Sequence, residues 1–326
     1  MTIVHAPPPE WAPHQAVWIG FPSHAELWGD AFEAAQRETA AFADAVHAGG
    51  AGETVLLIAA SEEAAATARS LVDPGVRVEV EHFGDVWLRD TGVILDGEGK
   101  AHRFGFNGWG RKYEYPGDED VGARLAQKRG MAITEHDWVL EGGAIDGDGT
   151  GVIVTTRQCL LNPNRNAESG EAETEARLKR DLGATRVLWL EAGLANDHTD
   201  GHVDNLARFV GPNRLALPEA AGEDDPNAAV YAQAARAAEA FGVELVRIPS
   251  PGRVLDESGE IIPASHMNFY IGNATVVVPT YGQASDDRAV AAIGALFPDR
   301  KAVGLRADHI LTGGGSFHCI SQQIPA

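Results

Sequence analysis

The sequence predicts an α/β fold built from repeated units, and two observations carry that prediction. Helical segments alternate with apolar strand segments along the chain, which is the pattern of strand and helix units that pack in layers. Clusters of polar residues follow these units five times, about 50 to 65 residues apart, although their residues differ from one cluster to the next. Units arranged around an axis would bring the five clusters together at its centre.

The first unit has the clearest signals. Residues 30–50 predict a helix, because Asp30 can cap its start, apolar residues recur on one face and two glycines end it. Residues 53–59 predict the strand that follows. Residues 61–71 predict a second helix, and the alternating valines of residues 76–81 predict a half-buried strand.

The later units repeat this order. Predicted helices cover residues 119–129, 171–182, 227–241 and 286–297. Each precedes a predicted strand, at residues 133–134, 186–190, 243–248 and 302–305. The polar clusters lie at residues 87–90, 140–143, 201–205, 265–268 and 317–319. No linker or shift of composition divides the chain, so we expect residues 1–326 to form a single catalytic domain.

Composition narrows the partners and the compartment. The 326 residues include 47 Asp and Glu against 26 Lys and Arg, a formal net charge of -21, so nucleic acid is not an expected partner, whereas a cationic ligand would be attracted. The alternative is that the acidic surface serves solubility alone. Only two cysteines occur, and no signal peptide or membrane-length apolar run is present. We expect a cytoplasmic protein without a membrane partner.

Residues suited to covalent catalysis occur in these clusters. Cys319 offers a nucleophile and His202 a base, while Asp90, Glu141 and Asp204 add negative charge. A thiolate is the attacking species, and crowded carboxylates are costly unless a cation lies between them. A planar guanidinium meets that need, because its N–H groups pair with carboxylates. His202 and Asp204, two residues apart, are predicted to share one face of a strand.

Other interpretations of the same residues remain open. Asp90 could form a structural ion pair with Arg89, and Glu141 could merely flank a glycine turn. Residues 197–204 are rich in metal-ligand types but lack the spacing of a zinc helix. Cys159 has the surroundings of a core thiol.

Taken together, these segments resemble the agmatine deiminase family, which is related to the bacterial peptidylarginine deiminases. The resemblance spans nearly the whole chain, and it is specific because many segments match in the order that the family shows. The segments that carry it are residues 10–14, 87–92, 104–110, 140–143, 155–166, 199–205, 268–270 and 313–325. Val93, Phe317 and Ser321 depart from residues common in the family, and none of them removes a catalytic group.

The resemblance implies a five-bladed α/β propeller of the pentein superfamily, with its active site at the centre. It implies that agmatine and water give N-carbamoylputrescine and ammonia through an amidino-cysteine intermediate, without metal or organic cofactor. Cys319 would be the nucleophile, His202 the general acid and base, and Glu141 a partner of the histidine or of the substrate. Asp90 and Asp204 would bind the guanidinium, and Trp87 could line the rest of the pocket.

Three further expectations follow. Relatives are often homodimers, so a homodimer is possible. The alternative substrate is a peptidylarginine or another guanidino compound. A catalytically idle guanidine-binding protein or a metal hydrolase is the alternative from another class.

Overall fold

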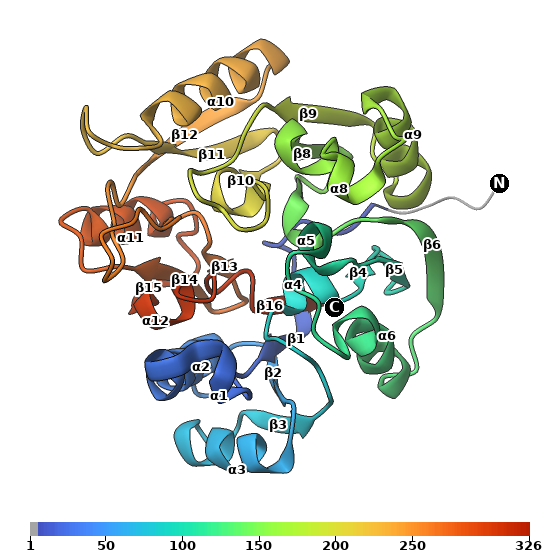
Figure 1. The fold of residues 1–326 in the computed structure, drawn as a ribbon, viewed down its shortest axis with the longest axis vertical. Helices are drawn as coiled ribbons and strands as arrows, with labels where there is room; N and C mark the ends of the chain where they lie inside the picture. Colours follow the sequence, from blue (N-terminus) through green and yellow to red (C-terminus); the bar gives the residue numbers. More distant parts are fainter. Residues whose placement is uncertain (1–5) are drawn as a thin grey trace.

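A computed structural model describes residues 6–326, which form five small sheets around a central axis (Figure 1). One sheet has four strands, and each of the other four has three. Every sheet contains at least one parallel pair of strands joined through a crossing helix. The predicted five-bladed α/β propeller is therefore confirmed.

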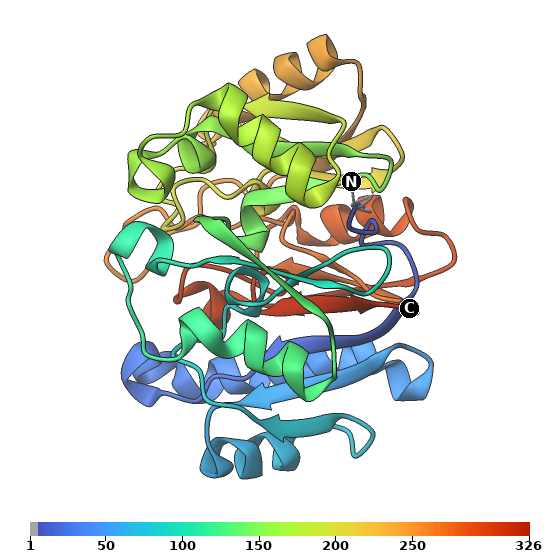
Figure 2. The same cartoon turned by 90° about the vertical axis from the view of Figure 1, so that its right-hand side faces the viewer.

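The first blade joins the two ends of the chain. Its strand order is β16 (Ser321–Pro325), β1 (His14–Gly20), β2 (Thr54–Ala59) and β3 (Arg77–Val80). β1 is antiparallel to β16 and parallel to β2, and β2 is parallel to β3. Figure 2 shows β16 beside β1 in the middle of the molecule. This pairing closes the ring and fixes the segment that precedes β16, which contains Cys319.

The other four blades share one design, in which the first two strands are antiparallel and the last two are parallel. A helix links the parallel pair, as a parallel connection requires. The blades are β4 (Ile94–Leu95), β5 (Ala101–Gly105) and β6 (Ile133–Val139) with α6 (Asp118–Lys128); β7 (Ile145–Gly147), β8 (Val152–Thr156) and β9 (Arg186–Leu190) with α9 (Glu171–Leu182); β10 (Arg208–Gly211), β11 (Arg214–Glu219) and β12 (Glu244–Pro249) with α10 (Ala228–Phe241); and β13 (Tyr270–Ile271), β14 (Thr275–Thr280) and β15 (Lys301–Arg306) with α11 (Asp286–Gly294).

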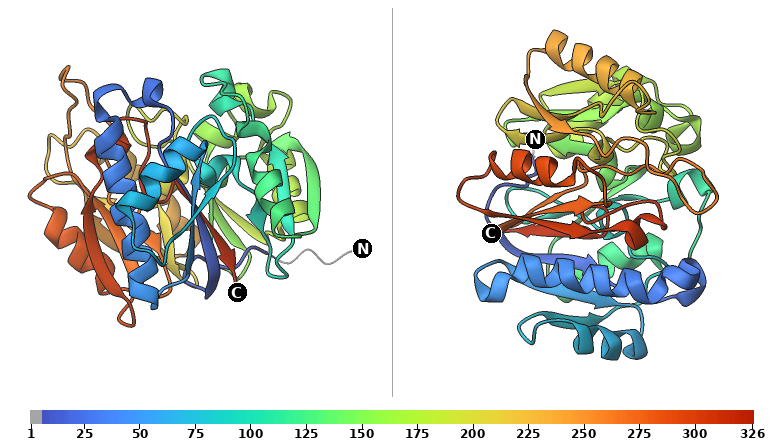
Figure 3. Two further views of the ribbon diagram at one scale, coloured as in Figure 1. Left: turned by 90° about the horizontal axis from the view of Figure 1, so that it is seen from below. Right: turned by 90° about the vertical axis from the view of Figure 1, so that its left-hand side faces the viewer.

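Three crossing helices pack between neighbouring blades. α2 (Phe32–His47) contacts β2 of its own blade and β14 and β15 of the last one, as the right-hand view of Figure 3 shows. α10 contacts β9 of the preceding blade, and α11 contacts β12. Phe42 of α2 stacks on Phe317 with ring centroids 4.7 Å apart, so this packing reaches the segment around Cys319. The apolar faces of the helices therefore stabilise the ring as well as their own sheets.

Two local predictions were wrong. Asp30 lies in a 3₁₀ turn (Gly29–Ala31), and α2 begins at Phe32 with Ala31 at its N-cap. His202 and Asp204 do not share a strand face, because residues Val203–Asn205 form a 3₁₀ turn. Such turns and short helices precede the first strand of a blade, so the polar clusters lie just before strands rather than in them. A change of one backbone dihedral angle or one hydrogen bond is enough to turn a strand end or a helix start into such a turn. The periodicity of apolar residues does not predict this choice.

The helix and strand predicted at residues 171–182 and 186–190 have these bounds in the structure, and the other predicted elements occur with shifted ends. The helix predicted at residues 61–71 is α3 (Glu62–Leu71), capped by the Ser61 side chain. The strand predicted at residues 133–134 continues to Val139. Among residues 6–326, no helix is long and apolar enough to cross a membrane.

Candidate active site

The five polar clusters meet at the centre of the ring. The Cys319 sulfur lies 3.5 Å from Oδ2 of Asp204 and 3.1 Å from Nδ2 of Asn268. The predicted base, His202, places Nδ1 3.6 Å from Oδ1 of Asp90, and that oxygen accepts a hydrogen bond of 2.9 Å from the amide of Gly143. Each cluster thus contributes at least one of these residues, as the repeated spacing predicted.

Glycines make this close approach possible. A Cβ at Gly143 would lie 2.6 Å from Nδ1 of His202 and 2.8 Å from Oδ1 of Asp90. A Cβ at Gly315 would lie 2.6 Å from Cζ3 of Trp87 and 3.1 Å from the Cys319 sulfur. Side chains at either position would therefore displace the predicted catalytic residues.

The Cys319 thiol is protonated in this arrangement. Its side chain is almost wholly enclosed, with 4% of the residue exposed. Burial raises the pKa of the thiol well above its usual range, and the carboxylates of Asp204 and Asp90 raise it further. A cation that compensates the two carboxylates would favour the thiolate.

Asp204 is held by a chain of buried charges that the sequence did not indicate. Its Oδ2 lies 2.7 Å from Nδ1 of His318, whose Nε2 lies 2.8 Å from Glu10. Glu10 in turn lies 2.8 Å from NH2 of Arg208. Burial would raise the pKa of Asp204, but the hydrogen bond and charge of His318 lower it overall. Oδ1 of Asp204 is buried and has no hydrogen-bond partner in the described part of the chain.

Asp90 has the opposite electrostatic setting. Its Oδ2 accepts a hydrogen bond of 2.9 Å from Nε1 of Trp109. Burial raises the pKa of Asp90 overall; the nearby His202 opposes this rise, and the charges of Asp204 and Glu141 add to it. Arg89 does not pair with Asp90, because its guanidinium contacts Gln323 at 2.7 Å and Glu10 at 3.5 Å. The alternative of an Arg89–Asp90 ion pair is therefore wrong.

Glu141 lies beside His202 and Cys159. Its Oε1 accepts a 2.5 Å hydrogen bond from Arg165, and both side chains are fully buried. Ligand atoms of Glu141, Cys159 and His202 all lie within 4.8 Å of one another, so these three side chains could also hold a metal ion. Burial opposes the charged form of His202, yet the Asp90 charge and the nearby Cys159 and Glu141 raise its pKa well above the usual value. His202 is therefore poised as an imidazolium that can donate a proton.

A cavity of about 150 Å³ leads to the thiol. Cys319, Asp90 and the predicted Trp87 line it, together with Trp109 and Asp85. His202, Asp204 and Glu141 do not line this cavity and lie behind the residues that do.

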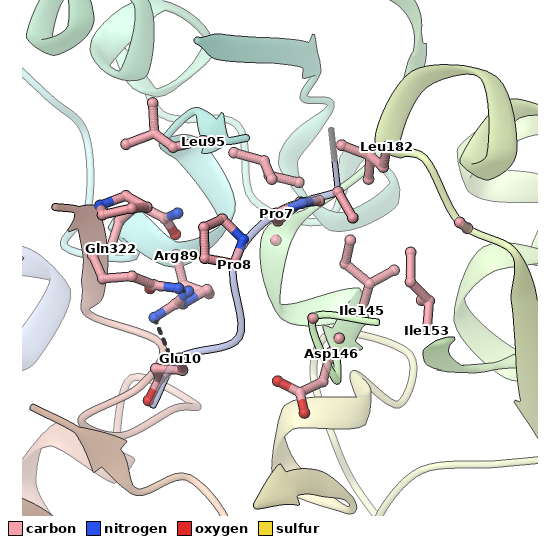
Figure 4. A pocket seen from close by; sticks show the side chains of 18 of the residues that line it. Pro7, Pro8, Glu10, Arg89, Leu95, Ile145, Asp146, Ile153, Leu182 and Gln322 are labelled. Atoms are coloured by element: carbon pink, nitrogen blue, oxygen red, sulfur yellow. Dashed lines mark hydrogen bonds and ion pairs between the residues drawn. The ribbon is translucent and has the colours of Figure 1, made fainter. Parts of the chain in front are cut away.

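A second cavity, of about 70 Å³, is lined by residues that include Pro8, Glu10 and Arg89 (Figure 4). Residues 312–315 line the first cavity, whereas Gln322, Gln323 and Pro325 line the second. Figure 4 shows Glu10 and Arg89 joined at its wall. Within residues 6–326, neither cysteine lines this second cavity. Its lining includes Glu10 and His318, which belong to the group of buried charges that holds Asp204.

Five blades around a buried thiol, a histidine and paired carboxylates form a site of the kind expected in an enzyme that modifies guanidino groups. The sequence model of the Porphyromonas-type peptidyl-arginine deiminases matches residues 6–325, and the chain belongs to this family.

Individual relatives agree with that placement. A putative agmatine deiminase of Pectobacterium atrosepticum is 35% identical over 98% of this chain and 94% of its own length. Two solved structures are also similar. The agmatine deiminase of Enterococcus faecalis has a TM-score of 0.90 and 27% identity over 98% of this chain and 96% of its own. A C. jejuni agmatine deiminase with substrate bound has a TM-score of 0.88 and 29% identity over 98% and 95%. DDAH from Pseudomonas aeruginosa, 13% identical with a TM-score of 0.55, shares the fold alone.

Proposed function

We propose that this protein is an agmatine deiminase, which hydrolyses agmatine to N-carbamoylputrescine and ammonia. The observation that carries the proposal is the enclosed Cys319 thiol beside two carboxylates, at the end of an open cavity. Among residues 6–326, no Lys or Arg lines this cavity, and the negative charge at its end favours a cationic ligand. The names of the full-length relatives support this reaction, and the name of the family, peptidyl-arginine deiminase, supports deimination of a guanidino group.

Substrate binding prepares the nucleophile. Asp90 and the free Oδ1 of Asp204 accept N–H groups of the guanidinium, which places its carbon next to the Cys319 sulfur. The positive charge compensates the carboxylates that raise the thiol pKa, so the thiol releases its proton to solvent through the cavity.

The reaction then proceeds in two halves. The thiolate attacks the guanidinium carbon and forms a C–S bond, and His202 donates its proton to the nitrogen that leaves as ammonia. Neutral His202 next accepts a proton from water, and the resulting hydroxide attacks the amidino carbon. The hydroxyl proton passes to the Cys319 sulfur as the C=O bond forms and the C–S bond breaks, which restores the thiol and releases the urea product. Glu141, fixed by Arg165, orients the histidine between these two proton transfers.

The test is a product assay with purified protein. We expect carbamoylputrescine and ammonia from agmatine, and no product from Cys319→Ala. Mass spectrometry of enzyme quenched during turnover should find an amidino adduct on Cys319. An adduct confined to Cys159, or equal activity in both proteins, would refute the assignment.

Parallel assays separate the remaining alternatives. If kcat/KM is higher for a peptidylarginine or for arginine than for agmatine, that compound and not agmatine is the preferred substrate. Stoichiometric zinc in the active protein would revive a metal hydrolase, with Glu141, Cys159 and His202 as its ligands. We also propose a cytoplasmic location, one catalytic domain over residues 1–326 and a homodimer, which cell fractionation, limited proteolysis and sedimentation would test.

A further inference from the structure

Asp85 is a carboxylate in the substrate cavity that the proposed chemistry does not use. It lines the same cavity as Cys319 and Asp90, and these two aspartates are the only acidic residues in the lining, within residues 6–326. Its side chain is buried, with 8% of the residue exposed. A buried acidic group beside a ligand cavity needs an explanation, because burying an uncompensated charge is costly.

The Asp85 side chain accepts hydrogen bonds from neutral groups, while the Asp85 amide donates one of 3.0 Å to Oδ1 of Asp118. Oδ1 of Asp85 accepts a 2.8 Å hydrogen bond from the amide of Val86, and Oδ2 accepts one of 2.8 Å from Nε1 of Trp87. In the described part of the chain, no Lys, Arg or His forms an ion pair with it. Two hydrogen bonds leave acceptor capacity on both oxygens, since a carboxylate offers about four lone-pair sites.

The Trp87 indole sets the distance between Asp85 and the thiol. Its Nε1 edge donates to Asp85, while its Cζ3 edge lies over Gly315, next to the Cys319 sulfur. One indole width therefore separates the reacting sulfur from the Asp85 carboxylate. The four-carbon chain of agmatine spans about 6 Å between its terminal nitrogens when extended, a length that suits this separation.

We propose that Asp85 binds the primary ammonium at the far end of the substrate and thereby selects agmatine among guanidino compounds. This inference rests on the proposed function. The ammonium would supply the cation that Asp85 lacks, and the rings of Trp87, Tyr113 and Tyr115 in the same lining would favour it by cation–π attraction. Arginine would bring the same ammonium together with a carboxylate that Asp85 repels, while a peptidylarginine would bring no charge there.

The ionisation of Asp85 agrees with this role. Burial raises its pKa to about 6, and the hydrogen bonds from Val86 and Trp87 limit the rise. The side chain is therefore mostly ionised at pH 7, and a bound ammonium would ionise it further.

The experiment compares agmatine with 1-butylguanidine, which keeps the guanidinium and the chain but lacks the amine. Asp85→Asn should lower kcat/KM for agmatine by about 10- to 100-fold, the effect of one charge-assisted contact. The value for butylguanidine should change by less than about threefold, which also shows that the variant is folded. Glu114→Gln is the matched control, because it removes an exposed carboxylate from the neighbouring loop.

Each outcome decides between two ideas. Equal losses for both substrates, or none for agmatine, would overturn the role of Asp85 while the proposed function stands. A wild-type enzyme without activity on either substrate would instead refute the proposed function. In that case, calorimetry still tests the binding site for the ammonium. Adding Asp85→Asn to Cys319→Ala should weaken agmatine binding by about 10-fold or more, and an unchanged affinity would contradict the role of Asp85.

Discussion

Replacing His318 by glutamine should damage both stability and substrate binding. His318 is buried between Asp204 at 2.7 Å and Glu10 at 2.8 Å, so both ring nitrogens face carboxylates. The substitution removes a cation and leaves two buried carboxylates with fewer partners. Breaking such a buried group of charges costs about 3–5 kcal/mol, and we expect a loss of this size in the free energy of unfolding.

The catalytic loss follows from Asp204. His318 occupies Oδ2 and leaves Oδ1 free for the guanidinium, so its removal frees the carboxylate to rotate. Loss of one charge-assisted contact predicts a fall in kcat/KM of roughly 10- to 100-fold, largely through KM. Residual activity is expected because Cys319 and His202 remain in place.

The pH dependence gives the sharpest test. The pKa of Asp204 is lowered in the folded protein, by His318 against the opposing effect of burial. Its ionised form therefore contributes stability that is present above the unfolded pKa of about 4 and is lost as pH falls through the lower folded pKa. Without His318 the folded pKa rises, so the acidic limb of kcat/KM against pH should move to higher pH.

The assay is urea unfolding together with pH profiles of kcat/KM, and His309→Gln is the control. His309 also pairs with a glutamate, Glu38 at 2.7 Å, but its side chain is 48% exposed, so its loss should cost about 0–1 kcal/mol. Equal unfolding free energies in the two variants, or an unmoved acidic limb, would refute this account of His318.

Three other predictions concern separate buried groups. Burial and two carboxylates raise the pKa of the Cys319 thiol, so iodoacetamide should alkylate it at pH 7 at least about 10-fold more slowly than free cysteine. Mass spectrometry of the resting enzyme measures this rate, and fast labelling would contradict a protonated thiol. Arg165→Met should lower the free energy of unfolding by about 3–5 kcal/mol by leaving Glu141 unpaired, and adding Glu141→Gln should recover part of it. Burial raises the pKa of Asp118 to about 7, so the folded protein binds a proton there more tightly than the unfolded chain does, and stability falls as pH rises from about 4 to 7. In urea unfolding, the free energy of unfolding of Asp118→Asn relative to wild type should therefore increase by up to about 4 kcal/mol between pH 4 and pH 8. A difference that does not depend on pH would contradict this explanation.

The arrangement of the blades could be predicted because it depends on patterns that recur. Residues 171–182 and 186–190 carry complete helix and strand signals, and both elements have these bounds in the structure. The turn at Val203–Asn205 could not be predicted in the same way, since alternation of side chains fits a strand equally well. Local hydrogen bonds decide that choice, including the one that the His202 amide donates to the Thr199 hydroxyl.

The site was predicted in part for a similar reason. Cys319, His202, Asp90 and Asp204 are types that catalysis uses, and their spacing brings them together. Glu10 and Arg208 act only through other residues, and their partners are distant in sequence, so nothing local marks them. His318 had a weak signal in its position next to Cys319. Whether the site residues perform the roles proposed for them stays a prediction.

The two carboxylates that face the thiol differ in a way that only their surroundings explain. The hydrogen bond and charge of His318 lower the pKa of Asp204 in spite of its burial, whereas burial, with the charges of Asp204 and Glu141, raises the pKa of Asp90 in spite of His202. Before substrate arrives, Asp204 is thus the fixed anion, and Asp90 is the group whose ionisation the guanidinium improves most. Because the same cation lowers the pKa of Cys319, guanidinium binding and thiol deprotonation are linked. A neutral amide would bind without this effect and leave the nucleophile protonated, so selectivity for a cationic substrate arises from the same charges that keep the resting thiol inert.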